Sequence, residues 1–151
     1  MRTYNLVCGF KRRYPMTVAN FLKRHSKVAE SIVDKDEDIL YAFCGQKNDS
    51  HTVIFDTCVV VVTNKRIIIG QKRFLWGYQL TTVIPEFFND LKLYSGLFWG
   101  TVEIDTVKEV IHISNLDKKS LDEIETNVNR IMLENKRKLS NKGDENNVRQ
   151  D

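Results

Sequence analysis

Residues 52–71 contain two runs of strand-forming residues separated by one polar tetrapeptide. The first run ends in four consecutive valines at 59–62, the second begins with three isoleucines at 67–69, and Thr63-Asn64-Lys65-Arg66 lies between them. Such residues suit a pleated, half-buried surface, and a short polar break between two such runs is typical of a hairpin. The segment therefore predicts two antiparallel strands, and it contains no catalytic group.

Similar runs occur before and after this hairpin. The pattern predicts about seven strands, over residues 39–45, 53–62, 66–71, 74–84, 91–94, 101–105 and 110–114. Residues 101–105 alternate strictly between polar and apolar side chains, as a strand with one buried face does. Evenly spaced short strands are typical of a compact antiparallel sheet or barrel.

A helix is predicted after the last strand. Ser120 and Glu123 have the spacing of a capping box, and an apolar stripe begins at Leu121 and extends to Met132. Lys136, Arg137 and Lys138 lie in the last turns, where cations favour the helix dipole. We expect the helix to end near residue 138 and residues 139–151, which are polar, to be a disordered tail.

The N-terminal segment has two predicted parts. Residues 1–15 show no clear period and are interpreted as an N-terminal arm, whereas residues 16–34 predict a basic amphipathic helix with Thr17 as its N-cap. His25 falls on the apolar side of this helix. We expect a histidine that is satisfied or at an edge, with a pH-sensitive contact to the barrel as the alternative.

The 151 residues suffice for one domain with a flanking element, and 42% hydrophobic and 28% charged residues are ordinary for a soluble protein. The short apolar run at residues 6–10 does not fit a secretory signal, and no apolar run reaches the length of a membrane span. The three cysteines lack CxxC spacing, which favours a reducing compartment. We therefore expect a cytoplasmic protein.

About seven strands followed by one capped helix resembles the order of a pleckstrin-homology (PH)-like domain. Residues 60–69, with Thr63-Asn64-Lys65-Arg66 at their centre, resemble the hairpin typical of bacterial PH-like domains, and residues 37–41 resemble their opening. Within these domains the chain resembles the YokE-like bacterial PH family, known mostly from firmicutes and their prophages. The resemblance implies a mainly β protein: a PH-like barrel or roll over residues 37–138, including the C-terminal helix that caps it.

The resemblance also implies a non-catalytic binding or scaffolding module without a cofactor, and one that can self-assemble into an oligomer. Phosphoinositide recognition does not carry over. The loop at residues 46–51 has one cation, Lys47, offset by Asp49, whereas a polyphosphate headgroup needs several convergent donors.

Residues for enzyme chemistry do not gather anywhere along the chain. His25, His51 and His112 fall in three different predicted elements without ligand spacing, and the glycines form no phosphate-binding loop. We therefore predict no catalytic, metal-binding or cofactor-binding residues and no small-molecule substrate.

Residues 1–30 contain seven Lys or Arg residues and one acid, although the net charge of the whole chain is only +3. The candidate residues for an anionic partner are Lys11, Arg12, Arg13, Lys23, Arg24 and Lys27. The plainest interpretation is that these charges are simply solvated. The functional hypotheses are an anionic membrane surface first, and then nucleic acid or an acidic protein partner. Nucleic acid is disfavoured because aromatics are not interleaved with cations on one strand face.

Leu97, Phe98 and Trp99 form an apolar cluster between two glycines. Core packing is slightly favoured for them, and if they are exposed, a subunit or membrane contact is more natural than a ligand pocket. Trp76-Gly77-Tyr78 shows a weaker version of the same ambiguity.

The sequence thus favours a binding module whose partner is a protein or a second copy of itself. Peripheral attachment to the inner face of the cell membrane, through the basic N-terminal region, is the specific hypothesis. Nucleic-acid binding by the same region is the alternative.

Overall fold

The computed structural model describes residues 1–150. Two helices, α1 (Arg2–Arg13) and α2 (Leu22–Glu30), precede a seven-stranded antiparallel sheet in the order β4-β3-β2-β1-β7-β6-β5. The strands are β1 (Ile39–Gln46), β2 (Thr57–Thr63), β3 (Ile67–Lys72), β4 (Tyr78–Val83), β5 (Phe88–Ser95), β6 (Trp99–Thr106) and β7 (Val110–Asp117). Two short 3-10 turns, η1 (Pro85–Phe87) and η2 (Lys118–Ser120), precede β5 and the final helix α3 (Leu121–Val148). The predicted PH-like arrangement of strands and C-terminal helix is confirmed.

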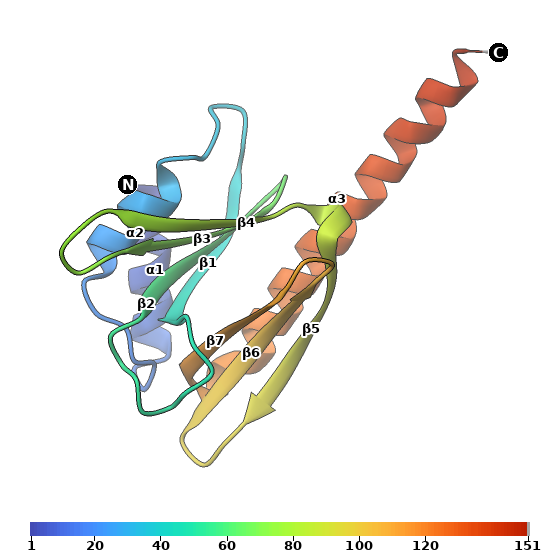
Figure 1. Ribbon diagram of the computed structural model, residues 1–151. Coiled ribbons are helices and arrows are strands. Elements are labelled where there is room, and N and C mark those ends of the chain that lie inside the picture. The colour runs from blue at the N-terminus through green and yellow to red at the C-terminus, as the bar shows by residue number, and fades with distance from the viewer. Residues whose placement is uncertain (151) are drawn as a thin grey trace.

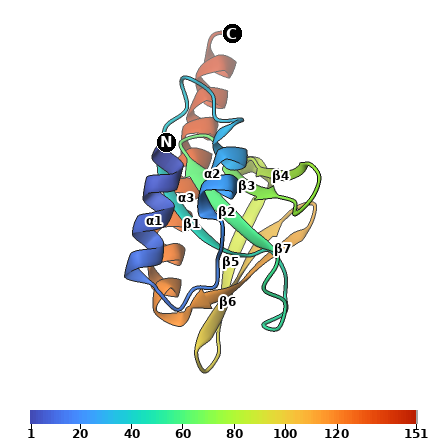
Figure 2. The same cartoon turned by 90° about the vertical axis from the view of Figure 1, so that its left-hand side faces the viewer.

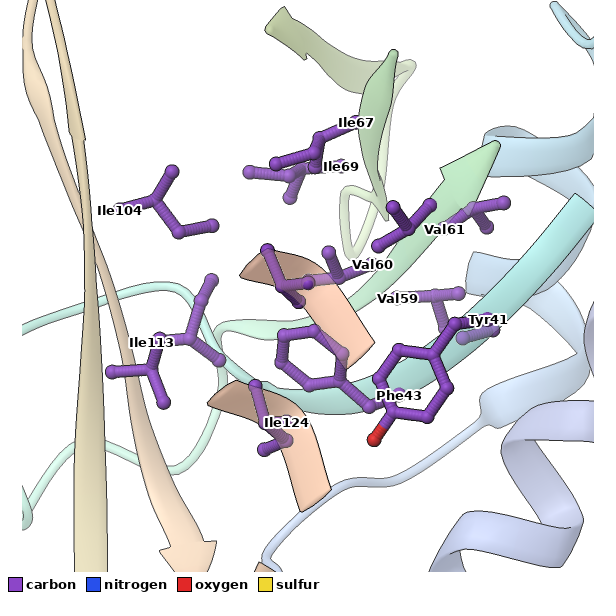
Figure 3. Packing of buried hydrophobic residues seen from close by; sticks show 14 of the residues in the cluster. Tyr41, Phe43, Val59, Val60, Val61, Ile67, Ile69, Ile104, Ile113 and Ile124 are labelled. Atoms are coloured by element: carbon purple, nitrogen blue, oxygen red, sulfur yellow. The ribbon is translucent and has the colours of Figure 1, made fainter. Parts of the chain in front are cut away.

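The sheet curls into two halves that meet where β1 crosses β7 (Figure 1). The paired residues at this crossing are Gln46 and Ser114. A Cβ atom at Gly45 would come within 2.7 Å of Ile113 Cγ2, so the strand has no room for a side chain there. The first half of α3 fills the space between the two halves. Figure 3 shows Ile124 of this helix beside Phe43 and Val60 of the first half, with Ile104 and Ile113 of the second half nearby.

The strands β1, β2 and the start of β3 are buried on both faces. On the inner face Phe43, Val60 and Ile69 are neighbours across the strands, and on the outer face Cys44 lies opposite Val59. Helices α1 and α2 lie side by side over the outer face (Figure 2). At Gly70 an added Cβ would lie 2.5 Å from the backbone nitrogen of Ala29, so α2 rests directly on the backbone of β3.

The predicted N-terminal arm over residues 1–15 is wrong, because most of it is helix α1. Thr3, Val7 and Phe10 are fully buried and recur at the spacing of one helix face. The Phe10 ring lies 5.9 Å from the Phe43 ring of β1, measured between centroids. The segment is therefore part of the hydrophobic core.

The predicted helix over residues 16–34 starts too early and ends too late. Helix α2 begins only at Leu22, after Phe21 adopts a left-handed φ of 53°. Thr17 does not cap it, since its hydroxyl accepts a hydrogen bond from the Asp117 backbone N–H at 3.0 Å. Residues 16–20 instead form a non-helical connection that is bonded to β7, since the Val18 N–H donates to the Asn115 carbonyl oxygen at 2.8 Å.

At the C-terminal helix two details differ from prediction. Ser120 makes no capping hydrogen bond; its hydroxyl donates to the carbonyl oxygen of Asp117, and Glu123 accepts from the Tyr41 hydroxyl at 2.8 Å. The expected disordered tail is helical through Val148, with exposed side chains, and this part of α3 projects away from the domain (Figure 1). Asp151 lies outside the described residues.

The polar turn Thr63–Arg66 is held by an ion pair between partly exposed Arg66 and buried Glu37. Arg66 donates from Nε and Nη2 to the two oxygens of Glu37 at 2.9 and 3.0 Å, and the Thr63 hydroxyl donates to the same carboxylate at 2.6 Å. Burial alone would raise the pKa of Glu37, but these hydrogen bonds outweigh it and lower the pKa. Because Arg66 also donates to the carbonyl oxygen of Ile32, this turn fixes the segment that joins α2 to β1.

The docking of α1 can be tested with Phe10→Ala. Removing a fully buried phenylalanine leaves a cavity, so we expect the free energy of unfolding to fall by about 3–4 kcal/mol in urea denaturation. Arg12→Ala, on the exposed side of the same helix, should change it by less than about 0.5 kcal/mol. Equal small effects for both variants would mean that the segment is a loose arm.

Candidate functional site

The six cations predicted as a site serve different purposes in the structure. Lys11 donates from Nζ to the carbonyl oxygens of Pro15 and Thr17, and Arg13 forms an ion pair with Glu123 at 3.2 Å. These two residues fasten α1 to its neighbours. Arg12 is exposed and donates to the Cys8 carbonyl oxygen of its own helix, and Lys23 is exposed on α2.

Arg24 lines a groove that the sequence did not predict. This cavity of about 560 Å³, here named the α2 groove, lies between the start of α2, the β1–β2 loop and the end of β3. Its lining residues are Asn20, Phe21, Arg24, His25, Ile54, Phe55, Thr57, Lys72, Arg73 and Phe74. A smaller cavity of about 330 Å³ adjoins it, shares Arg24 and Lys72 with it, and adds Lys27 and Tyr78.

Large apolar side chains form the rim of the α2 groove. Phe55 in the β1–β2 loop is 91% exposed, and Phe74 and Trp76 in the β3–β4 turn are 87% and 83% exposed. Gly77 completes this turn with a φ of 70°, which favours glycine. In the ribbon both segments extend beyond the body of the sheet (Figure 1). Exposed apolar residues gathered in this way mark an interaction surface.

The charge of the α2 groove is positive throughout. Arg24, Lys27, Lys72 and Arg73 line the two adjoining cavities, and no Asp or Glu is among the lining residues. Within residues 1–150 none of these four side chains lies within ion-pair distance of a carboxylate. Arg24 also lies over the Phe21 ring, 6.0 Å from its centroid. The groove therefore offers uncompensated cations beside apolar side chains.

His25 lies at the floor of the α2 groove and is 7% exposed. Its Nδ1 accepts a hydrogen bond from the backbone N–H of Lys72 at 2.9 Å, so the residue is a satisfied histidine that links α2 to β3. Burial, together with the charge of Arg24, lowers the pKa of His25 to about 4. The imidazole is therefore neutral near pH 7.

Leu97 and Phe98 are 77% and 55% exposed in the β5–β6 turn, so the prediction that this cluster packs in the core is wrong. Trp99 is partly buried, and its Nε1–H donates to the carbonyl oxygen of Met16 at 2.8 Å. None of the three residues lines the α2 groove. They form a second, separate apolar surface.

The start of the β1–β2 loop differs from the groove in charge. Lys47 donates to the Thr81 hydroxyl at 3.0 Å, and the cavity beside it, about 310 Å³ in volume, is also lined by Asp49 and Glu109. Positive and negative side chains therefore share this cavity, in contrast to the α2 groove.

Across residues 1–150 no three His, Cys, Asp or Glu side chains lie close enough together to hold a metal ion. In the same part of the chain no helix combines the length and the apolar character that crossing a membrane requires.

The sequence contained part of the signal for the groove. Lys72-Arg73-Phe74-Leu75-Trp76 places two cations directly before three large apolar residues in a turn. Predicting a strand over residues 74–84 hid this pattern, because strand residues were expected to face a core. Phe55 was hidden in the same way by the predicted strand over residues 53–62, whereas β2 begins only at Thr57.

Residues 33–130 match the family described as "Bacterial PH domain", which is more than half of the chain. This chain belongs to the bacterial PH-domain family. The match begins after α2, so Asn20, Phe21, Arg24 and His25 add a wall to the groove from outside the matched segment.

Among solved structures, the PH domain from Shewanella amazonensis SB2B is similar to this chain at 12% sequence identity. The comparison covers 77% of this chain and 87% of that one, with a TM-score of 0.43. No curated protein matches the chain.

The neutral state of His25 makes stability depend on pH. The unfolded chain binds a proton at this residue below about pH 6.5 and the folded chain only below about pH 4, so stability is lost as the pH falls through this window. His25→Gln keeps an acceptor for the Lys72 N–H but does not titrate. Between pH 7 and pH 4.5 we expect the unfolding free energy of the wild type to fall by about 2 kcal/mol more than that of His25→Gln. A difference that stays constant with pH would contradict this account.

Proposed function

We propose that this protein attaches peripherally to anionic membrane surfaces through the α2 groove and its rim. The observation that carries the proposal is that exposed Phe55 and Phe74 line the groove together with cations and no acid, while exposed Trp76 lies in the same turn as Phe74. PH domains are generally non-catalytic modules that bind proteins or lipids, which agrees with a binding role.

The physical basis is a division of labour between loops and cations. Aromatic side chains in an exposed turn enter the interfacial layer of a bilayer, which lies between the polar headgroups and the apolar acyl chains. Each Lys or Arg close to an anionic surface adds about 1 kcal/mol of attraction, and this attraction weakens with salt. Arg24, Lys27, Lys72 and Arg73 would therefore add a salt-sensitive attraction to the insertion of the aromatic side chains.

The partner is the one expected from the sequence, an anionic membrane, but the residues assigned to the contact differ. The cations proposed to contact the membrane are Arg24, Lys27, Lys72 and Arg73. Lys11 and Arg13 are excluded because their side chains are bonded within the protein. Attachment to the anionic inner face of a cell membrane, and hence a cytoplasmic location, is part of this proposal. Membership of the YokE-like subfamily and a prophage origin remain predictions.

Nucleic-acid binding is the second candidate, and one observation favours it. Aromatics and cations are not interleaved along one strand of the sequence, which disfavours stacking of bases. In space, however, aromatic and cationic side chains line the groove together: Phe21, Phe55, Phe74, Arg24, Lys72 and Arg73. Bases stack on aromatic faces, but they gain little from Leu75 or Ile54, which extend the same surface. We therefore rank the membrane first.

Self-assembly or protein binding is proposed for the separate surface around Leu97 and Phe98. Its exposure fits a subunit contact better than a ligand pocket. Light scattering of wild type and Phe98→Ser measures this directly, since a subunit contact there predicts a larger mass that the substitution lowers.

The membrane proposal is tested by flotation with neutral and anionic vesicles at low and high salt. We expect binding to anionic vesicles that weakens with salt, and a loss of at least about tenfold in Phe74→Ser/Trp76→Ser. The matched control is Leu97→Ser/Phe98→Ser, which removes exposed apolar residues from the other surface and should bind like wild type.

A second pair of variants tests the charge. Arg73→Glu should weaken binding by about tenfold or more, whereas Arg12→Glu makes the same change in net charge outside the groove and should stay within about twofold. Equal losses in both would mean that only net charge matters, and no flotation would refute the proposal. A salt-sensitive shift with single-stranded DNA but not vesicles would favour the second candidate.

A further inference from the structure

The interior of the α2 groove is suited to an apolar ligand. Its side walls include Phe21, Ile54, Phe55 and Phe74. Two acceptors at its floor already have partners, and the first is Thr57 Oγ1, which accepts from the Asn20 N–H at 3.1 Å and from Gln46 Nε2 at 2.8 Å. His25 Nδ1 is likewise bonded to β3. A polar ligand entering the groove would lose its hydrogen bonds to water and find few replacements.

The cationic side chains that line the groove favour a ligand that also carries an anionic group. Arg24 comes from α2, and Lys72 and Arg73 come from the end of β3 and the turn after it, so cations line the cavity from two sides. Without a carboxylate among the lining residues, their charge is available to a ligand. Charge-assisted hydrogen bonds from Arg to phosphate are among the strongest that proteins form.

The size of the groove limits the occupant to one molecule. A volume of about 560 Å³ falls in the range of pockets that enclose a single small ligand. A flat bilayer surface cannot fill such a cavity, so contact of the rim with a membrane would leave its walls without a partner. One lipid chain drawn out of the layer would fill it.

We infer that the α2 groove takes one acyl chain of an anionic phospholipid, with the phosphate held by Arg24, Lys72 and Arg73. This inference rests on the proposed membrane attachment and adds a specific molecule to it. The match between an apolar interior, in which Thr57 Oγ1 and His25 Nδ1 are already bonded, and a cationic lining selects this chemistry over a free sugar phosphate or an apolar peptide. The part of the α2 groove proposed to hold the acyl chain is lined partly by Phe21 and Asn20, which lie outside the segment that matches the family.

The experiment uses single-chain lipids below their micelle concentration, without vesicles. Lysophosphatidylglycerol with chains of 10 to 14 carbons is titrated into the full-length protein in a calorimeter. We expect saturable binding of one lipid per protein, with affinity rising roughly fourfold per added methylene until the groove is full. Lysophosphatidylcholine of equal chain length should bind at least about tenfold more weakly, and so should lysophosphatidylglycerol to Arg73→Glu.

A groove-filling variant separates this inference from the membrane proposal. The Asn20 side chain is exposed and lines the groove, while its backbone N–H makes the bond to Thr57, so Asn20→Trp should fold normally and occupy this part of the groove. We expect Asn20→Trp to lose lysolipid binding but still float with anionic vesicles, and the size control Asn20→Ala to keep both.

Wild-type protein that floats with vesicles but binds no lysolipid would overturn the inference and leave the membrane proposal standing. Lysolipid binding unchanged in Asn20→Trp would also overturn it, because the chain would then lie elsewhere. Equal binding of the zwitterionic lipid would remove the role of the cations. Failure of both flotation and lysolipid binding would refute the two proposals together.

Discussion

The structure depends on the burial of β1, β2 and β3 on both faces. Four consecutive valines in β2 leave no solvent face for this strand, so the outer side of the sheet needs a cover as much as the inner side does. Helices α1 and α2 provide that cover: Ala29 of α2 is fully buried against β3, and Phe10 of α1 is fully buried beside Phe43 of β1. Removing residues 1–34 would expose this surface to water. A truncation therefore cannot separate binding from folding, and point variants are needed.

The same constraint creates the candidate site. Because α2 rests directly on the backbone of β3 at Gly70, its first turn comes to lie beside the β1–β2 loop and the β3–β4 turn. The ion pair of Arg66 with Glu37 holds the connection from α2 to β1 at the other end of β3. The groove is thus a consequence of how the N-terminal helices cover the sheet, with Arg24 on one wall and Lys72 on the other.

Local patterns predicted the strands and the C-terminal helix, because each depends on a run of residues close together in sequence. The runs around Thr63 and the stripe from Leu121 to Met132 carry that information directly. The cover over the outer face was harder to see, although β-branched residues without alternation indicate burial on both sides. Nothing local says which segment supplies it. The groove was missed because residues 21, 54 and 74 meet only after three separate elements have packed.

Hydrogen–deuterium exchange of the full chain, with and without anionic vesicles, tests the central claim most directly because it locates the contact without any substitution. If the α2 groove and its rim are the binding surface, backbone amides at residues 53–57 and 72–78 and at the start of α2 become protected. The β5–β6 turn and the projecting end of α3 keep their exchange rates. Protection confined to the β5–β6 turn or to the end of α3, with residues 72–78 unchanged, would contradict the account.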